Sequence, residues 1–294
     1  MTMSLSDQAS PAPGLLAEAS GRFVRHRLGM LGALIIGILI LVALFGPTLA
    51  PYEPDKMHFM SPFSEPTSEF LLGTDDFGRD ILSRIMYGAR VSLQVGFISV
   101  GIAATVGTGL GMIAGYTRRR AIDEAIMRSM DVLLAFPTIL LAIAVIAILG
   151  KGVTNAMIAI GVVYTPIFAR IARGEVLSVK NEEYVQAARA LGATDGAILI
   201  RHILPNILPP IIVETSLSLS FAILAEAALS FFGLGTQAPD PSWGLMLSES
   251  RKFFNNSIWM GIFPGMAIML TVMGFNFLGD GLRDALDPRM KNVR

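Results

Sequence analysis

The chain has 294 residues, of which 53% are hydrophobic and 16% charged, and its mean hydropathy is +0.60. Soluble domains of this length carry about a quarter charged residues, so the composition excludes an ordinary soluble protein. With a net charge of zero, the chain shows no sign of a basic nucleic-acid-binding surface. The absence of cysteine excludes disulfides and thiolate metal sites, and the three histidines lie far apart in the sequence, which argues against a histidine metal cluster.

Charge-poor apolar runs of eighteen or more residues predict membrane-spanning helices. Six such runs occur, at residues 28–50, 91–117, 132–150, 152–169, 207–232 and 258–279. The fold class predicted is therefore all-α, a polytopic membrane protein with six transmembrane helices. We expect residues 1–21 to be disordered and residues 22–294 to form a single transmembrane domain. The first run is too long for a signal peptide and is expected to remain as an anchor.

The distribution of basic residues predicts the orientation of the spans. With the N-terminus inside, sixteen of the 23 lysines and arginines lie in the inner segments and seven in the outer ones. Cytoplasmic loops carry such an excess. Both termini and the loop 181–206 are therefore expected in the cytoplasm, and the segments 51–89 and 233–257 outside.

The first external segment holds a cluster of charges. Asp75, Asp76 and Asp80 surround Arg79, and Arg84 follows shortly after. Such carboxylates either bind a hard cation or pair with arginine, and the nearby arginines favour a salt-bridged cap over the helix ends.

The second run contains glycines at every fourth position, Gly107, Gly111 and Gly115. Gly109-x-Gly111-x-x-Ala114 resembles a dinucleotide-binding motif, but no predicted strand precedes it, and close helix packing is the better interpretation. In the next two runs, Pro137 and Pro166 are expected to kink their helices; kinks in membrane helices often line a pathway.

The cytoplasmic loop 181–206 predicts two short helices. Asn181 is a candidate N-cap for the first, and Gly192 suits the left-handed position that ends it. The second is expected to start near Thr194 and to be stopped by Pro205. Residues at helical spacing form one face of the first helix: Tyr184, Ala187, Ala188 and Leu191. A pair this short is unstable alone, so it packs either on its own membrane domain or on a partner.

Two carboxylates lie in the fifth run, Glu214 and Glu226. Twelve residues apart on a helix, they lie about 120° apart around its axis and do not form one proton-relay face. Intramembrane acids are candidates for function. Glu226 is therefore a candidate for the translocation pathway, with a bond to a neighbouring helix as the alternative.

The loop residues Ala187-Ala188-x3-Gly192-x11-Leu204-Pro205 resemble the cytoplasmic signature of the permease subunits of ABC importers. Gln186 stands where that family has glutamate and His202 where it has isoleucine, so an ion pair of the family's glutamate is not carried over. Four further blocks resemble the C-type subunit of dipeptide and oligopeptide permeases: Leu72–Asp80 with Leu82–Arg84 and Gly88–Arg90, Asp131 with Ala135–Pro137, Phe232–Gly235 with Pro241–Gly244, and Gly279–Asp284 with Leu286–Arg289. The resemblance runs from about residue 22 to the C-terminus.

The resemblance implies a type I ABC importer permease fold and assigns two groups of residues. The loop that couples the permease to an ATPase would comprise Glu183, Tyr184, Gln186, Ala187, Ala188, Leu191, Gly192, Leu204 and Pro205. External docking of a substrate-binding protein would involve Asp75, Asp76, Arg79, Asp80, Pro241 and Trp243. The possible translocation pathway comprises Glu226, Pro137 and Pro166.

The function expected is a non-enzymatic permease subunit that passes di- or oligopeptides through a bacterial or archaeal inner membrane. No Gly-x4-Gly-Lys-Ser/Thr phosphate loop occurs, so we expect no cofactor in this chain, and ATP and Mg²⁺ on partner subunits. The implied partners are a homologous permease forming a heterodimer, two ATPases, an external binding protein and lipid, without nucleic acid. The alternatives are transport of nickel complexes, glutathione or oligosaccharides, a proton-driven transporter using Glu226, or, least supported, a membrane-embedded enzyme.

Overall fold

The computed structural model describes residues 15–286 and is built from helices, with no β-strand in that range. The helices are α1 Leu15–Arg25, α2 Arg27–Leu49, α3 Ile81–Tyr116, α4 Arg120–Leu134, α5 Thr138–Leu149, α6 Val153–Val179, α7 Glu183–Ala190, α8 Asp195–Ile198, α9 Leu204–Phe231, α10 Trp243–Ser250 and α11 Trp259–Leu286. A π-helical turn, Leu199–Ile203, joins α8 to α9, and a 3₁₀ turn, Arg251–Phe253, follows α10.

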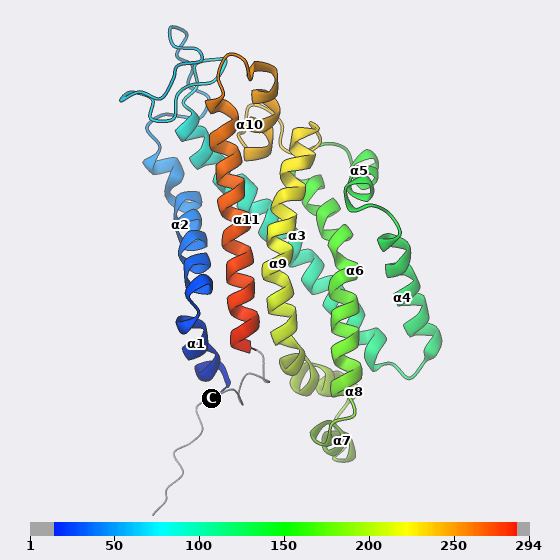
Figure 1. Cartoon of the computed structure of the whole chain (residues 1–294). Coiled ribbons are helices and arrows are strands. Elements are labelled where there is room, and N and C mark those ends of the chain that lie inside the picture. The colour runs from blue at the N-terminus through cyan, green and yellow to red at the C-terminus, as the bar shows by residue number, and fades with distance from the viewer. Residues whose placement is uncertain (1–14, 287–294) are drawn as a thin grey trace, which may run out of the picture.

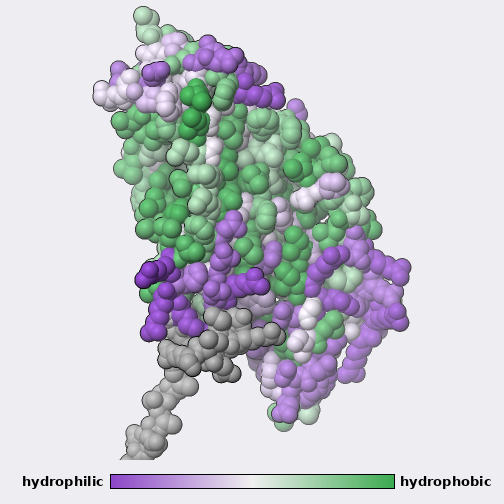
Figure 2. Space-filling model, viewed as in Figure 1, coloured by the Kyte–Doolittle hydropathy of each residue, from purple (hydrophilic) through white to green (hydrophobic). Residues whose placement is uncertain are grey.

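The long helices stand side by side, and α3 crosses them at a slant (Figure 1). Five helices are long and apolar enough to cross a membrane: α2, α3, α6, the joined α8–α9 and α11. The bent pair α4–α5 is the sixth candidate. A broad hydrophobic belt covers the visible face between two hydrophilic ends (Figure 2). The all-α class is therefore confirmed, and the number of six spans holds when the bent pair is taken as one.

The two ends of the bundle differ in their elements. Figure 1 places α1, α7, α8 and the last turn of α11 at one end, called the α7 end below. The opposite end, called the α10 end, carries α10 and the segment 51–80.

One predicted span is broken. Residues 132–150 do not form a single helix, because α4 ends at Leu134 and α5 begins at Thr138, with a bend of 99° between them. Pro137 lacks the N–H that would continue the helix, and its ring disfavours a helical backbone at Phe136. The kink expected at Pro137 is thus a full break, whereas α6 runs without interruption through Pro166.

Several helices extend past the apolar runs. The helix of the second predicted span, α3, begins at Ile81 instead of residue 91, and α6 ends at Val179 instead of residue 169. Asp80 starts α3, since its carboxylate accepts a hydrogen bond of 2.8 Å from the Ser83 N–H. The external segment predicted as 51–89 therefore ends at residue 80. A helix continues beyond the lipid wherever packing partners remain, which hydropathy alone does not reveal.

Two segments outside the predicted spans contain helices. Residues 15–21, expected to be disordered, belong to α1, which packs against α11. Residues 1–14 lie outside the described range. The second external segment, 233–257, contains α10, whose first turn is capped by the Ser242 hydroxyl accepting from the Leu245 N–H at 3.2 Å.

The closest packing in the bundle joins α3 to α6, as the glycine spacing predicts. A Cβ added at Gly107 would lie 2.5 Å from the Thr165 carbonyl oxygen, and one at Gly111 would overlap the Ala169 carbonyl. Only glycine permits backbones this close, so α3 and α6 form one rigid pair.

Gly107→Ala should therefore destabilise the chain by about 1–3 kcal/mol, the usual cost of overpacking. Gly109→Ala is the matched control, because the space around Gly109 is open and the substitution favours a helix. The midpoint of thermal unfolding in detergent would compare the two. Equal midpoints would show that α3 and α6 separate easily.

Candidate functional site

The segment between α6 and α9 protrudes at the α7 end (Figure 1). α7 begins after Glu182, which occupies the N-cap position predicted for Asn181 and makes no side-chain capping bond. Gly192 has φ +82°, the left-handed conformation predicted for it. The Thr194 hydroxyl then caps α8 by accepting from the Ala197 N–H at 3.3 Å.

The prediction that Pro205 stops the second helix is wrong. Pro205 lies in the first turn of α9, and the chain continues as helix to Phe231. The π-helical turn before it contains a hydrogen bond from the Leu204 N–H to the Leu199 carbonyl. A proline in a first turn loses no helical hydrogen bond, so it is tolerated there. The chain from α8 to the end of α9 is consequently one continuous helical path.

α7 exposes an apolar surface to solvent. Leu191, the residue that ends α7, is 89% exposed and Tyr184 is 42% exposed, with the small side chain of Ala187 also exposed. These three residues are called the α7 surface below. Ala188, predicted for the same face, instead packs partly against the core beside the fully buried Val185. Exposed apolar side chains gathered on one helix beyond the hydrophobic belt make this a candidate contact surface.

The other predicted loop residues frame this surface. Glu183 and Gln186 are exposed, and Gln186 donates a hydrogen bond of 3.2 Å to the Lys180 carbonyl. Leu204 is half-buried against the core and Pro205 is exposed. Burial, followed by the charge of the neighbouring Glu182, raises the pKa of the Tyr184 hydroxyl, and the ring is neutral at physiological pH even without this shift.

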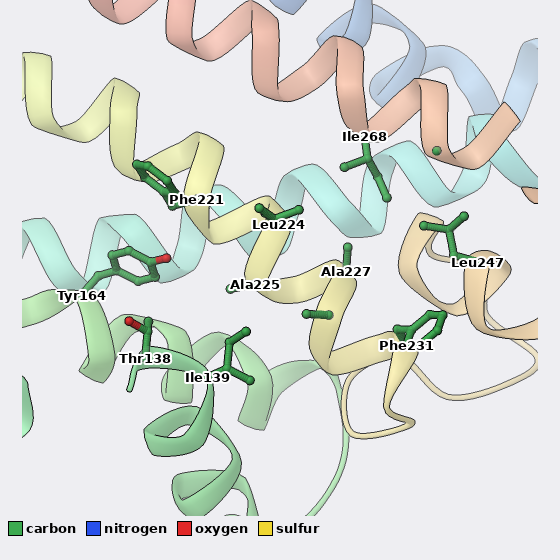
Figure 3. Close-up of a pocket in the computed structure, with 12 residues that line it drawn as sticks. Thr138, Ile139, Tyr164, Phe221, Leu224, Ala225, Ala227, Phe231, Leu247 and Ile268 are labelled. Atoms are coloured by element: carbon green, nitrogen blue, oxygen red, sulfur yellow. The ribbon is translucent and has the colours of Figure 1, made fainter. Parts of the chain in front are cut away.

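A second feature is an apolar groove of about 460 Å³ between α5, α6, α9, α10 and α11. Figure 3 shows Phe221, Leu224 and Phe231 of α9 along one side and Thr138 and Ile139 at the start of α5 along the other. The lining residues are Thr138, Ile139, Tyr164, Phe221, Leu224, Ala225, Ala227, Ala228, Phe231, Leu247, Gly265 and Ile268. The groove is almost entirely hydrocarbon, apart from the hydroxyls of Thr138 and Tyr164.

The predicted pathway residues relate to this groove in different ways. Pro137 precedes Thr138, so the break it causes places the start of α5 at the groove. Pro166 is buried within α6 and does not line the groove.

Glu226 does not line the groove either, although Ala225 and Ala227 beside it do. Its side chain is 1% exposed and accepts hydrogen bonds from Ser230 at 2.7 Å and Ser92 at 3.2 Å. Ser92 belongs to α3, so the carboxyl group bonds to a neighbouring helix, the alternative that the sequence left open.

At the α10 end, charged residues form a buried cluster. Arg79 Nε lies 2.6 Å from Asp75 Oδ2, and Arg84 Nη2 lies 3.0 Å from Glu249 Oε2 of α10. Arg84 also lies 3.6 Å from Asp75, and Arg79 lies 3.6 Å from Asp76. The salt-bridged cap favoured by the sequence is therefore present, and it joins segment 51–80 to α10.

The carboxylates of this cluster outnumber its arginines. Burial raises the pKa of Glu249, with the Arg84 and Arg79 guanidinium groups opposing that shift. Burial, followed by the charge of Asp75, also raises the pKa of Asp76. Raised pKa values mean that acidification protonates these two groups more readily than exposed carboxyls.

The residues predicted for external docking are mostly inaccessible. Asp75, Arg79 and Asp80 are buried, as is Pro241, and Trp243 is fully buried with its indole N–H donating to the Ile85 carbonyl at 3.1 Å. Asp76 is mostly covered. A buried side chain does not touch a partner in this conformation, so these residues shape the loops instead. Exposed apolar side chains lie in the same segments, at Phe59, Met60 and Phe254.

Sequence reasoning missed Glu249, the groove residues and Tyr116. Glu249 pairs with an arginine 165 positions away, and no spacing of nearby residues predicts such a contact. The groove side chains are ordinary apolar residues on spans, like those that face lipid. Tyr116 lies at the end of α3, and its polar hydroxyl is the one feature of the sequence that could have indicated a role.

Comparison with known proteins identifies the family. Residues 107–292 match the family described as "Binding-protein-dependent transport system inner membrane component", and residues 14–66 match "N-terminal TM domain of oligopeptide transport permease C". The dipeptide transport system permease protein DppC of Alkalihalophilus pseudofirmus is 52% identical over 94% of this chain and 90% of its own length. The glutathione transport system permease protein GsiD of Pectobacterium atrosepticum is 46% identical over 92% and 90%.

A further relative covers nearly the whole chain. The di/tripeptide transport system permease protein DppC of Pseudomonas aeruginosa is 44% identical over 98% of this chain and 97% of its own. Among solved structures, an inward-facing conformation of the MetNI methionine ABC transporter has a TM-score of 0.57 at 20% identity, covering 70% of this chain and 96% of that one. That likeness supports the fold. The chain belongs to the binding-protein-dependent transport system inner membrane components, the permease subunits of ABC importers.

Proposed function

We propose that this chain forms half of the pathway by which an ATP-driven importer passes di- and oligopeptides through a bacterial or archaeal inner membrane. The observation that carries the proposal is the α7 surface, an apolar contact face held beyond the hydrophobic belt. The names of relatives that share 52% and 44% of their sequence with this chain support peptides as cargo. Relatives named for glutathione, itself a tripeptide, support the same class of cargo.

The α7 end lies in the cytoplasm in this proposal, together with both termini. Exposed basic residues gather at that end, at Arg118, Arg119, Arg120, Arg128 and Arg201. An excess of lysine and arginine on cytoplasmic segments is the usual determinant of orientation. Arg289, Lys291 and Arg294, which the sequence placed on the same side, lie outside the described residues.

The α7 surface is the binding site for an ATPase subunit. A short helix with a small side chain at its centre and larger apolar ones at its edges suits a helix-in-groove contact. Two ATPases would bind, one to this chain and one to a homologous permease, and they would hold the ATP and Mg²⁺. Gln186 carries no charge, so shape through Ala187 and Leu191 dominates the contact.

The groove forms this chain's wall of the translocation pathway, and the homologous permease closes the other side. An almost wholly apolar lining offers a charged peptide no dedicated binding partner. A pathway of this kind releases cargo easily, and it leaves selection to the external binding protein. Nickel complexes and oligosaccharides remain alternatives carried by the family resemblance alone.

The binding protein would dock at the α10 end, on segments 51–80 and 233–257. The exposed Phe59, Met60 and Phe254 provide the contacts, and the buried ion cluster beneath holds both segments in place.

A cross-linking experiment tests the ATPase contact. The chain has no cysteine, so Leu191→Cys introduces its one thiol, which can carry a benzophenone maleimide. We expect illumination of the complex to join this chain to an ATPase subunit. Ile200→Cys, 65% exposed in the adjoining π-helical turn, and the unmodified chain are the controls. A transporting complex in which the labelled Leu191→Cys variant reaches no ATPase would contradict the proposal.

Glu226→Gln separates this function from proton-driven transport. Glutamine keeps the length of the side chain: its one oxygen can accept from one of the two hydroxyls, of Ser92 and Ser230, and its NH2 group can donate to the other. We therefore expect uptake of radiolabelled alanylalanine in proteoliposomes to stay within about twofold of the wild type, since an exchanged neutral hydrogen bond costs little. A proton carrier would lose its titrating group, so abolished uptake with normal folding would favour the proton-driven alternative.

A further inference from the structure

The hydroxyl of Tyr116, at the last residue of α3, lies between two side chains of the α7–α8 segment. It donates a hydrogen bond of 2.7 Å to Asp195 Oδ1, at the start of α8. It accepts one of 3.0 Å from Arg189 Nη2, in the last turn of α7. The Arg189 guanidinium also lies 5.6 Å from the centre of the Tyr116 ring. One side chain of α3 thus contacts both short helices, across the turn that separates them.

These contacts matter because α7 has few others. Val185 is the one fully buried side chain of α7. Irregular turns flank the helix on both sides, at residues 180–182 and 191–194. A second tie holds the start of the segment, where Lys180 Nζ donates to the Gly115 carbonyl at 2.8 Å. Both ties end on the last turn of α3, so that turn fixes the direction in which α7 projects.

The opposite end of α3 belongs to the buried ion cluster. Arg84, in the first turns of α3, contacts Glu249 of α10 at 3.0 Å. The helix has 36 residues and a length of about 54 Å, enough to connect both ends of the bundle. Its close packing on α6 through Gly107 and Gly111 stiffens it along the way.

We propose that Tyr116 is a positioning residue that ties the α7–α8 segment to α3, so that a displacement of α7 moves α3 and, through Arg84 and Glu249, reaches α10. This inference rests on the proposed function, in which α7 takes up the motion of an ATPase. Hydrogen bonds to charged groups are among the stronger ones in proteins, and here two of them meet on one hydroxyl. Without these two hydrogen bonds α7 still binds the ATPase, but it rotates about its flanking turns, and its displacement is not transmitted to α3.

Tyr116→Phe tests the tie, because it removes the hydroxyl and keeps the ring under Arg189. In proteoliposomes holding the complete transporter and its loaded binding protein, we expect ATP hydrolysis to continue and alanylalanine uptake per ATP to fall about tenfold. Tyr87→Phe is the matched control: it lies in the same helix and loses one hydroxyl bond, to the Pro47 carbonyl at 3.2 Å. Its uptake per ATP should equal that of the wild type.

Three outcomes would overturn the inference. The first is an unchanged ratio of uptake to ATP in Tyr116→Phe. The second is loss of the cross-link from Leu191→Cys when Tyr116→Phe is added, which would make the hydroxyl a support for the α7 seat instead of a tie. The third concerns the double variant Tyr116→Phe with Asp195→Ala. If its loss of uptake per ATP equals the product of the two single losses, the residues act independently, whereas members of one network should not. Failure of the proposed function is distinct, because the Leu191→Cys thiol would then reach no ATPase even beside wild-type Tyr116.

Discussion

Replacing Ala187 with tryptophan should abolish peptide uptake while the chain still folds and reaches the membrane. Ala187 is the small residue of the α7 surface, and its side chain faces solvent in this chain. An indole at this exposed position enlarges the face that the proposed ATPase cleft must accept. Overpacking a close contact costs about 1–3 kcal/mol, which is a loss of about fivefold to about 150-fold in affinity.

Two measurements separate the effects of this variant. Uptake of alanylalanine reports transport, and co-purification of the ATPase subunits with the tagged permease reports assembly. Both should fail together. Ala121→Trp is the control, at an alanine of α4 that is also exposed, and it should leave both unchanged. Full uptake by Ala187→Trp would mean that the α7 surface faces no tightly fitting partner.

The second large effect is expected at the α10 end, where Arg84→Ala should destabilise the chain by about 3–5 kcal/mol. The Arg84 side chain is 1% exposed and lies between Asp75 and Glu249. Its removal leaves the buried Asp75 and the partly exposed Glu249 near each other with one cation fewer. Because burial already raises the pKa of Glu249, the variant should regain part of its stability as the pH falls and that group becomes neutral.

The midpoint of thermal unfolding in detergent, measured at several pH values, tests this expectation. The direction follows from the raised pKa: the folded state binds a proton more readily than the unfolded one, so acidification favours folding. Arg90→Ala is the control in the same helix, since Arg90 is exposed and forms no ion pair among the described residues. It should change stability by no more than about 0.5 kcal/mol. Equal midpoints for the two variants would show that the cluster does not hold the cap together.

The sequence predicted the features that depend on residues close together in the chain. Runs of apolar residues long enough to cross a bilayer need a helix, because no water is present there to satisfy the backbone. The positive φ of Gly192, the Thr194 cap and the packing at Gly107 follow from residue type and spacing in the same way. The first short helix predicted in the loop 181–206 is α7, and its end before Gly192 follows from the same local rules, whereas the N-cap position predicted for Asn181 is occupied by Glu182.

The predictions that failed concern which side chains are accessible and where helices begin, break and end. Trp243 and Asp75 resemble surface residues of an external loop, yet both are buried. Pro205 was predicted to end a helix, but it follows a π-helical turn and lies in the first turn of α9, which continues to Phe231. Each outcome depends on a neighbour that lies far away in the sequence or on a turn whose geometry hydropathy does not encode.

The sequence by itself determined the all-α membrane fold and the position of the α7–α8 segment, because lipid and helix geometry act on consecutive residues; the six predicted spans agree with the structure when the bent pair α4–α5 is counted as one. The tertiary structure decided which side chains meet: Arg84 with Glu249, Glu226 with Ser92, and Tyr116 with Asp195 and Arg189. Those pairs join residues dozens of positions apart, and only the packing of whole helices brings them within bonding distance.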